Sequence, residues 1–137
     1  MKQKQWSDKT LLKAIRNPSK EAYEIKMKAA EVAFEGVCGQ PDFALLYITF
    51  YPADKVIELK SMKEYFYQFR SRIYSYERLI NVIYEDMMEV YEPERLRLVM
   101  VCNARGGISS KLTIDSDWKS RGGEEEYRDW VGQSEEW

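Results

Sequence analysis

Apolar and polar residues alternate with the period of a β-strand at two places in the first half of the chain. Residues 23–28 alternate apolar and charged side chains, and residues 43–51 form a nearly continuous run of aromatic, aliphatic and β-branched residues. Both patterns predict strands. Residues 29–34 are ambiguous, because alanine and glutamate dilute the β pattern. The glycines and proline of residues 35–41 predict a loop between the two strands.

A helical period follows a turn at residues 52–55 and a short extended segment at residues 56–58. Residues 60 to about 72 predict one helix, and residues 76–90 predict a second helix capped by Ser75. The apolar positions expected to face inward are Met62, Phe66 and Phe69 in the first helix and Leu79, Ile80, Ile83, Met87 and Val90 in the second.

Two further strands complete the pattern. Residues 96–101 and 108–114 have strand-like composition, with a turn at residues 105–107 between them. The order strand, strand, helix, helix, strand, strand predicts an α+β fold, in which a four-stranded antiparallel sheet carries two helices on one face. Strands left open at the edges of such a sheet would pair with neighbouring subunits, which favours an oligomer.

The segments outside this core are short. A helix is expected from Ser7 or Asp8 to Arg16, and an acidic tail follows residue 115. With 137 residues and a core at about residues 22–115, the chain predicts a single domain over residues 1–137.

The amino-acid composition excludes several kinds of functional site. The net charge of −2 gives no overall basic surface for nucleic acid, and the chain has no histidine, the commonest metal ligand and general base. Cys38 and Cys102 lack the spacing of a metal site, so no metal is expected. No signal peptide or membrane-length apolar segment is recognised, and a cytoplasmic protein is predicted.

One charged stretch lies at the junction of strand and helix. Glu58 stands at the predicted strand end, and Lys60 and Lys63 stand three residues apart at the helix start. Residues three apart share a helix face, so the two ammonium groups suit an anion such as phosphate. The same charges would also be found in a solvated turn between strand and helix.

The residue sequences of three motifs indicate a family resemblance. The sequence Glu58-Leu59-Lys60-Ser61-Met62-Lys63 resembles the signature of the QueF family of nitrile reductases, with Glu64 as a departure and Tyr65 as a match. The Gly39-Gln40-Pro41-Asp42-Phe43 loop and the Arg105-Gly106-Gly107-Ile108-Ser109 turn are similar to two other motifs of that family. The resemblance extends from about residue 23 to residue 110.

This resemblance implies an activity and a set of residues. The family reduces 7-cyano-7-deazaguanine to 7-aminomethyl-7-deazaguanine with NADPH, in queuosine biosynthesis for tRNA modification. It uses a cysteine that attacks the nitrile carbon and an aspartic acid that protonates the nitrogen. Asp42 matches the acid. The nucleophile position falls at Glu35 when counted without gaps and at Gly36 with one residue deleted, so Cys38 in a shortened loop is the candidate nucleophile.

The resemblance also assigns the binding residues. Glu77 is expected to anchor the guanine-like edge of the substrate, beside Tyr76, which replaces the family's histidine, and with Glu58 as a further contact. NADPH is expected to bind Lys60, Ser61, Lys63 and Arg105. The chain therefore resembles a divergent member of the family.

The resemblance implies the tunnelling fold and a homo-oligomer with its sites at subunit boundaries. Two other functions stay open at this point. One is the QueF-like amidinotransferase reaction, which adds ammonia to the same nitrile carried on tRNA, although that branch lacks the NADPH motif. The other is a protein that binds a deazapurine or pterin-like ring without covalent chemistry. The sequence does not decide among these functions.

Overall fold

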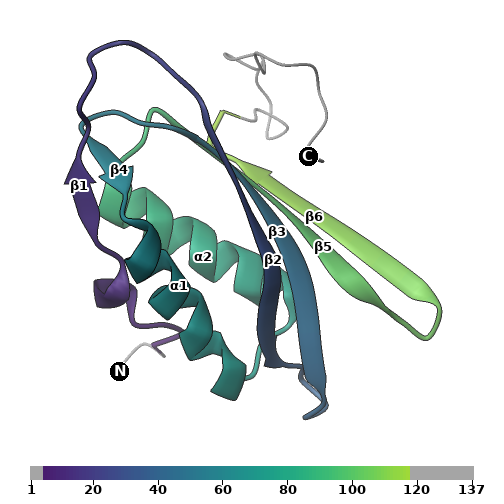
Figure 1. The fold of residues 1–137 in the computed structure, drawn as a ribbon. Coiled ribbons are helices and arrows are strands. Elements are labelled where there is room, and N and C mark those ends of the chain that lie inside the picture. The colour runs from purple at the N-terminus through teal and green to yellow at the C-terminus, as the bar shows by residue number, and fades with distance from the viewer. Residues whose placement is uncertain (1–4, 118–137) are drawn as a thin grey trace.

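Two helices cover one face of a four-stranded antiparallel sheet (Figure 1). The fold is taken from a computed structural model, which describes residues 5–117. The strand order is β2-β3-β5-β6, and the elements are β2 (Ile25–Glu35), β3 (Pro41–Tyr51), α1 (Leu59–Tyr67), α2 (Tyr76–Tyr91), β5 (Arg95–Arg105) and β6 (Ile108–Asp115). The predicted α+β arrangement and its element order are confirmed.

The core lies between the sheet and the helices. Alternate residues of β3 and β5 point toward the helices, because successive side chains of a strand lie on opposite faces. They meet the buried stripe of α2 and the inner residues of α1, and together they include Leu46, Ile48, Phe50, Leu98, Met100, Leu79, Ile83, Met87, Met62, Tyr65 and Phe69. The predicted inward positions are mostly confirmed, although Tyr65 is buried in α1 where Phe66 was expected and Phe66 is only half-buried.

The first helix is shorter than predicted. It ends at Tyr67, and the chain continues as a 3₁₀ turn, η2 (Gln68–Ser71). The residues after η2 run beside the end of β2, where the Glu35 N–H donates to the carbonyl of Arg72 (2.9 Å) and the Tyr74 N–H donates to the carbonyl of Glu35 (2.9 Å). This contact fixes where α2 begins, at the predicted Ser75 cap.

The predicted N-terminal helix is wrong. Residues 9–11 form only a 3₁₀ turn, η1 (Lys9–Leu11), and β1 (Ala14–Arg16) then pairs with β4 (Lys55–Ile57) in a separate two-stranded sheet. A helix would have left the backbone of β4 unpaired, whereas the β1–β4 ladder satisfies both segments. The predicted acidic tail lies largely outside the described residues.

Two hairpins position the chemistry described below. The β2–β3 pairing ends at Glu35 opposite Pro41, so the loop predicted over residues 35–41 is confirmed but shorter by one residue at each end. The β5–β6 hairpin turns at Gly106 and Gly107, whose φ angles of 57° and 81° favour glycine. No helix within residues 5–117 is long and apolar enough to span a membrane.

Candidate active site

Three polar side chains meet where β3 begins. Arg105 forms an ion pair with Asp42 through its Nη2 atom, and its Nε donates a hydrogen bond to the Tyr76 hydroxyl (2.9 Å). The Tyr76 hydroxyl in turn donates to Oδ1 of Asp42 (3.1 Å). Asp42 is buried, whereas Arg105 is partly exposed. Each of the three groups therefore bonds to the other two, and the network is exposed to solvent on the side of Arg105.

The network depends on three elements that are distant in sequence. Asp42 is the second residue of β3, Tyr76 is the first residue of α2, and Arg105 is the last residue of β5. A register shift in the β5–β6 ladder between Cys102 and Arg105 accompanies the turn that carries the guanidinium group. The Tyr76 ring packs edge-on against Phe34 (6.0 Å between centroids), which fixes its hydroxyl over Asp42.

A small pocket of about 190 Å³ lies over this network. It is lined by Gly36, Val37, Asp42, Tyr74, Ser75, Tyr76, Glu77 and Arg105. Glu77 is exposed, and within residues 5–117 its carboxylate has no hydrogen-bond or ion-pair partner. Small-molecule pockets usually measure about 300–1,000 Å³, so this subunit by itself offers only part of such a site.

Burial and neighbouring charges alter two groups of the site. Burial raises the pKa of Tyr76, and its hydrogen bond to Asp42 raises it further, against the opposing effect of Arg105. Burial also raises the pKa of the Cys102 thiol to about 11, helped by the charges of Asp42 and Glu77. Cys102 is thus a protonated, buried thiol at neutral pH and does not suit the role of a nucleophile.

Cys38 lies at the exposed tip of the β2–β3 loop. The Gly39 N–H donates to the carbonyl of Gly36 (2.8 Å), and the Gly36 N–H donates to the carbonyl of Gln40 (2.8 Å). These bonds make a tight turn with Gly39 at a φ of 79°. Gly36 and Val37 line the pocket, whereas Cys38 belongs neither to the lining nor to the polar network.

Sequence reasoning missed two contributions to this site. It assigned Asp42 and Arg105 to different roles, whereas the structure pairs them directly. It also gave no role to Gly36, where a Cβ would lie 2.6 Å from Nη2 of Arg105 and 2.0 Å from Nε2 of Gln40. Only glycine therefore leaves room for the guanidinium group and the Gln40 amide. The match of Gln40 to the Gly-Gln-Pro-Asp loop was the one sequence signal that could have drawn attention to Gly36.

Three of the predicted cofactor residues, Lys60, Ser61 and Lys63, lie at the start of α1 and not in this pocket, as does Glu58, which was predicted to contact the substrate. Glu58 caps α1, accepting hydrogen bonds from the N–H groups of Ser61 (2.7 Å) and Lys60 (3.2 Å), and these bonds lower the pKa of its carboxyl group. Lys60 and Lys63 are exposed, but Ser61 is buried and its hydroxyl bonds to Lys13 and to the Glu58 carbonyl. A cofactor role for Ser61 stays a prediction and would require that hydroxyl to change partners.

The two groups of predicted residues belong to different elements. Asp42 lies at the start of β3, whereas α1 begins after β4 and then runs back beside the sheet, so that the residues after η2 reach the end of β2 (Figure 1). The chain therefore brings together Asp42, Tyr76, Glu77 and Arg105, but does not bring Glu58, Lys60 and Lys63 into the same pocket.

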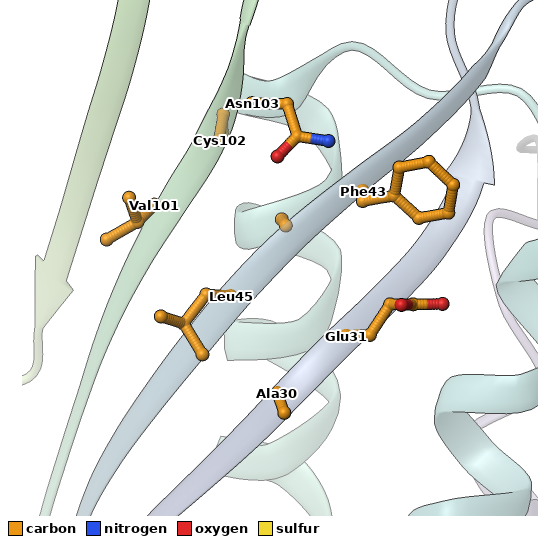
Figure 2. A pocket seen from close by; sticks show the side chains of 8 residues that line it. Ala30, Glu31, Phe43, Leu45, Val101, Cys102 and Asn103 are labelled. Atoms are coloured by element: carbon orange, nitrogen blue, oxygen red, sulfur yellow. The ribbon is translucent and has the colours of Figure 1, made fainter. Parts of the chain in front are cut away.

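A second hollow lies on the face of the sheet that the helices leave open. Figure 2 shows Phe43, Leu45 and Val101 pointing away from α2, with Glu31 and Asn103 at its edge. Its lining combines apolar side chains with Glu31 and Asn103, and it gathers no cluster of charged side chains. It therefore suits packing rather than acid–base chemistry.

Comparisons with known proteins assign the chain to a family. A family model described as "QueF-like protein" matches residues 41–121. The chain belongs to the QueF-like family. The match includes Asp42, Tyr76, Glu77 and Arg105, as well as the whole of the charged stretch from Glu58 to Lys63.

The curated relatives share one name. The NADPH-dependent 7-cyano-7-deazaguanine reductase of Thermomicrobium roseum is 37% identical over 106 residues, covering 74% of this chain and 81% of that protein. The reductases of Magnetococcus marinus and Vesicomyosocius okutanii are 36% and 39% identical over 111 and 114 residues, covering 78% and 80% of this chain and 85% and 84% of those proteins. The family relationship therefore covers most of the chain.

A solved structure shares the fold of this QueF-like chain. The crystal structure of the archaeosine synthase QueF-Like in the apo form superposes with a TM-score of 0.63, covering 68% of this chain and 92% of that one at 14% identity. At this identity the likeness concerns the fold alone. It confirms the tunnelling fold expected from the sequence motifs.

Proposed function

We propose that this protein reduces the nitrile of 7-cyano-7-deazaguanine to a primary amine with NADPH. The observation that carries the proposal is the pocket formed by Asp42, Tyr76, Glu77 and Arg105, in a chain that is 36–39% identical to reductases of that name. The carboxylate of Glu77, which is free of protein partners within residues 5–117, can accept hydrogen bonds from the adjacent N–H donors of a deazaguanine ring.

The residues present fit NADPH. Lys60 and Lys63 are exposed on one face of α1, and among residues 5–117 neither ammonium group forms an ion pair, so both are available to phosphate groups. Bound NADPH would supply hydride to the nitrile carbon twice for each nitrile reduced. Arg105 is a further candidate for the cofactor, provided that it leaves Asp42.

We assign the covalent step to Cys38. After loss of the thiol proton to solvent, its sulfur would form a bond to the nitrile carbon as one π bond of the nitrile breaks, and the nitrogen would take one proton, which yields a thioimide. Asp42, once protonated, is the candidate donor of that proton and is left as a carboxylate, to which the hydrogen-bonded Tyr76 hydroxyl can return a proton. Because an acid role requires a protonated carboxyl group, Arg105 has to leave Asp42 before the proton is transferred. The C–S bond has to break again before the amine is released, which returns the sulfur of Cys38 to its free state.

A complete site requires a second copy of the chain under this proposal. The lysines of α1 do not line the Asp42 pocket, and the pocket of one subunit is small. We infer a homo-oligomer in which α1 of one subunit lies near the Asp42 pocket of another. An exposed free thiol at Cys38 also suits a reducing compartment, so we expect a cytoplasmic protein.

Intact-mass measurement tests the covalent step. Wild-type protein mixed with 7-cyano-7-deazaguanine in the absence of NADPH is expected to gain the full mass of the nitrile, and to oxidise NADPH when the cofactor is added. Cys38→Ala should abolish both signals, because the attacking sulfur is removed. Cys102→Ala is the matched control and should keep both.

Two results would contradict this assignment. If Cys38→Ala oxidises NADPH at the wild-type rate, the reaction does not use this thiol. If wild-type protein neither gains mass nor consumes NADPH, the reductase proposal fails.

A further inference from the structure

An exposed stripe of cations and one aromatic ring runs along α1 and η2. It consists of Lys60, Lys63, Tyr67 and Arg70, all of which are exposed. At 100° per residue, the first three lie within an arc of about 60° on the helix surface. Because η2 has three residues per turn, Arg70 follows Tyr67 on the same line. The change from α-helix to 3₁₀-helix after Tyr67 therefore keeps Arg70 on the same face as the rest of the stripe.

The stripe ends in a preformed flat surface. The Arg70 guanidinium lies over the Tyr67 ring, 4.7 Å from its centroid. Tyr67 is 66% exposed, whereas the neighbouring Tyr65 and Phe69 are fully buried. The helix therefore uses its other aromatic residues for the core and presents this ring to solvent. A planar cation on an aromatic face is a surface on which a purine ring can stack.

The positive charges along the stripe are available to a ligand. Among residues 5–117, no carboxylate forms an ion pair with Lys60, Lys63 or Arg70. The whole chain has a net charge of −2, so this local excess of cations is not a reflection of overall composition. Glu64 is the one acidic residue within the helical part of the stripe, and it lies at its margin.

We propose that Tyr67 and Arg70 bind the adenine of NADPH, and that Lys63 and Lys60 bind its phosphate groups. This inference rests on the proposed function and adds two residues that the sequence motifs did not indicate. Lys63 lies about one turn from Tyr67, roughly 6 Å along the axis, and suits the ribose 2′-phosphate next to the adenine. Lys60 lies almost one turn further and suits the diphosphate.

The arrangement explains how NADPH would be distinguished from NADH. The 2′-phosphate is the only group that differs between the two cofactors, and an ammonium group without an ion-pair partner next to the adenine site would favour the one that carries it. The nicotinamide end would then extend beyond Lys60, past the start of α1, toward a neighbouring subunit. The stripe therefore sets both the preference for NADPH over NADH and the direction in which the bound cofactor runs along α1.

Calorimetric titration with NADPH and with adenosine 2′,5′-bisphosphate tests the stripe. Tyr67→Ala and Arg70→Ala should each weaken binding of both compounds by about 10-fold, because each removes one half of the stacking surface. Tyr67→Phe keeps the ring and should bind like wild type. Lys63→Ala should weaken adenosine 2′,5′-bisphosphate more than 5′-AMP.

Arg78→Ala provides a matched control. Arg78 is an exposed arginine that also lies over an aromatic ring, that of Trp6 at 4.5 Å, but it belongs to α2. Its removal should leave cofactor affinity unchanged. If wild type binds NADPH and the Tyr67 and Arg70 variants bind it equally well, the stripe is not the adenine site and the proposed function stands. If wild type binds no NADPH, both proposals fail together.

Discussion

Tyr76 holds the candidate site together at the scale of single residues. Its hydroxyl donates to Asp42 and accepts from Arg105, so one oxygen atom bonds both to a carboxylate and to a guanidinium group. It stands where the family resemblance expects a histidine. Because burial and Asp42 raise its pKa, Tyr76 keeps its proton throughout the neutral range. The residue can therefore orient Asp42 and relay a proton, but it cannot carry the positive charge of an imidazolium.

Tyr76→Phe tests this role. Removal of the hydroxyl should lower the rate of nitrile reduction by about 10- to 100-fold, since Asp42 loses its oriented donor. Binding of the deazaguanine ring should change little, because Glu77 is untouched. Steady-state kinetics and ligand titration would separate the two effects. An unchanged rate, together with a lower melting temperature, would show that the hydroxyl serves only packing.

An internal ion pair joins β5 to β6 at the scale of secondary-structure elements. Both oxygens of Asp115 at the end of β6 bind Arg95, the first residue of β5, at 3.2 Å and 2.7 Å, and both side chains are almost completely buried. Burial opposes ionisation of Asp115, but its bonds to Arg95, Arg97 and the Asp117 N–H lower the pKa of the carboxyl group below its usual value. The last strand is therefore held by charge as well as by its ladder.

Asp115→Asn should lower the free energy of unfolding by about 3–5 kcal/mol at neutral pH, because it removes the carboxylate charge that neutralises the buried Arg95. The folded-state pKa of Asp115 is depressed, so its stabilisation is complete above the unfolded pKa and is lost as pH falls through the folded pKa. The difference between wild type and variant should thus shrink below about pH 4.

Urea denaturation at a series of pH values measures this difference. Asp54→Asn is the control, since Asp54 is exposed in the turn before β4 and should alter stability by less than about 0.5 kcal/mol. A constant difference between wild type and the Asp115 variant down to pH 3 would contradict the linkage.

The two sets of candidate functional residues do not line the same pocket within one subunit. The cationic stripe follows α1, and the Asp42 pocket lies at the β2–β3 loop (Figure 1). The sheet also leaves one side of β2 and one side of β6 largely without a partner strand among the described residues, where a second copy can pair. Both features favour an assembly in which each site draws on two subunits.

Mixed oligomers test the shared site. Lys63→Ala and Cys38→Ala should each be nearly inactive as pure proteins, because they remove different halves of the same site. After denaturation and refolding together in equal amounts, about one quarter of the interfaces combine two intact halves and activity should return to that level. Sedimentation would show the assembly itself, as a species above the 16.3 kDa of one chain. No recovery in a confirmed mixed oligomer would place the complete site within one subunit.

The periodicity of the sequence determined most of the fold. Apolar residues spaced for strands and helices predicted the four strands of the main sheet, both helices and their order, because burial of one face requires that spacing whatever the partner. The motifs also marked the turn that precedes Asp42 and the start of α1 correctly. Short segments were less predictable: residues 14–16 became a strand because β4 offered a partner, which no local pattern contains.

Only the tertiary structure decided which functional side chains meet. Asp42 and Arg105 are 63 residues apart, and their pairing depends on the ladder between β3 and β5 and on the turn at Gly106. Ser61 shares a motif with Lys60 and Lys63, yet helical rotation buries its side chain and exposes theirs. Sequence motifs record residue types and spacing, whereas contact between distant residues is set by strand register and helix orientation, which depend on the packing of the whole chain.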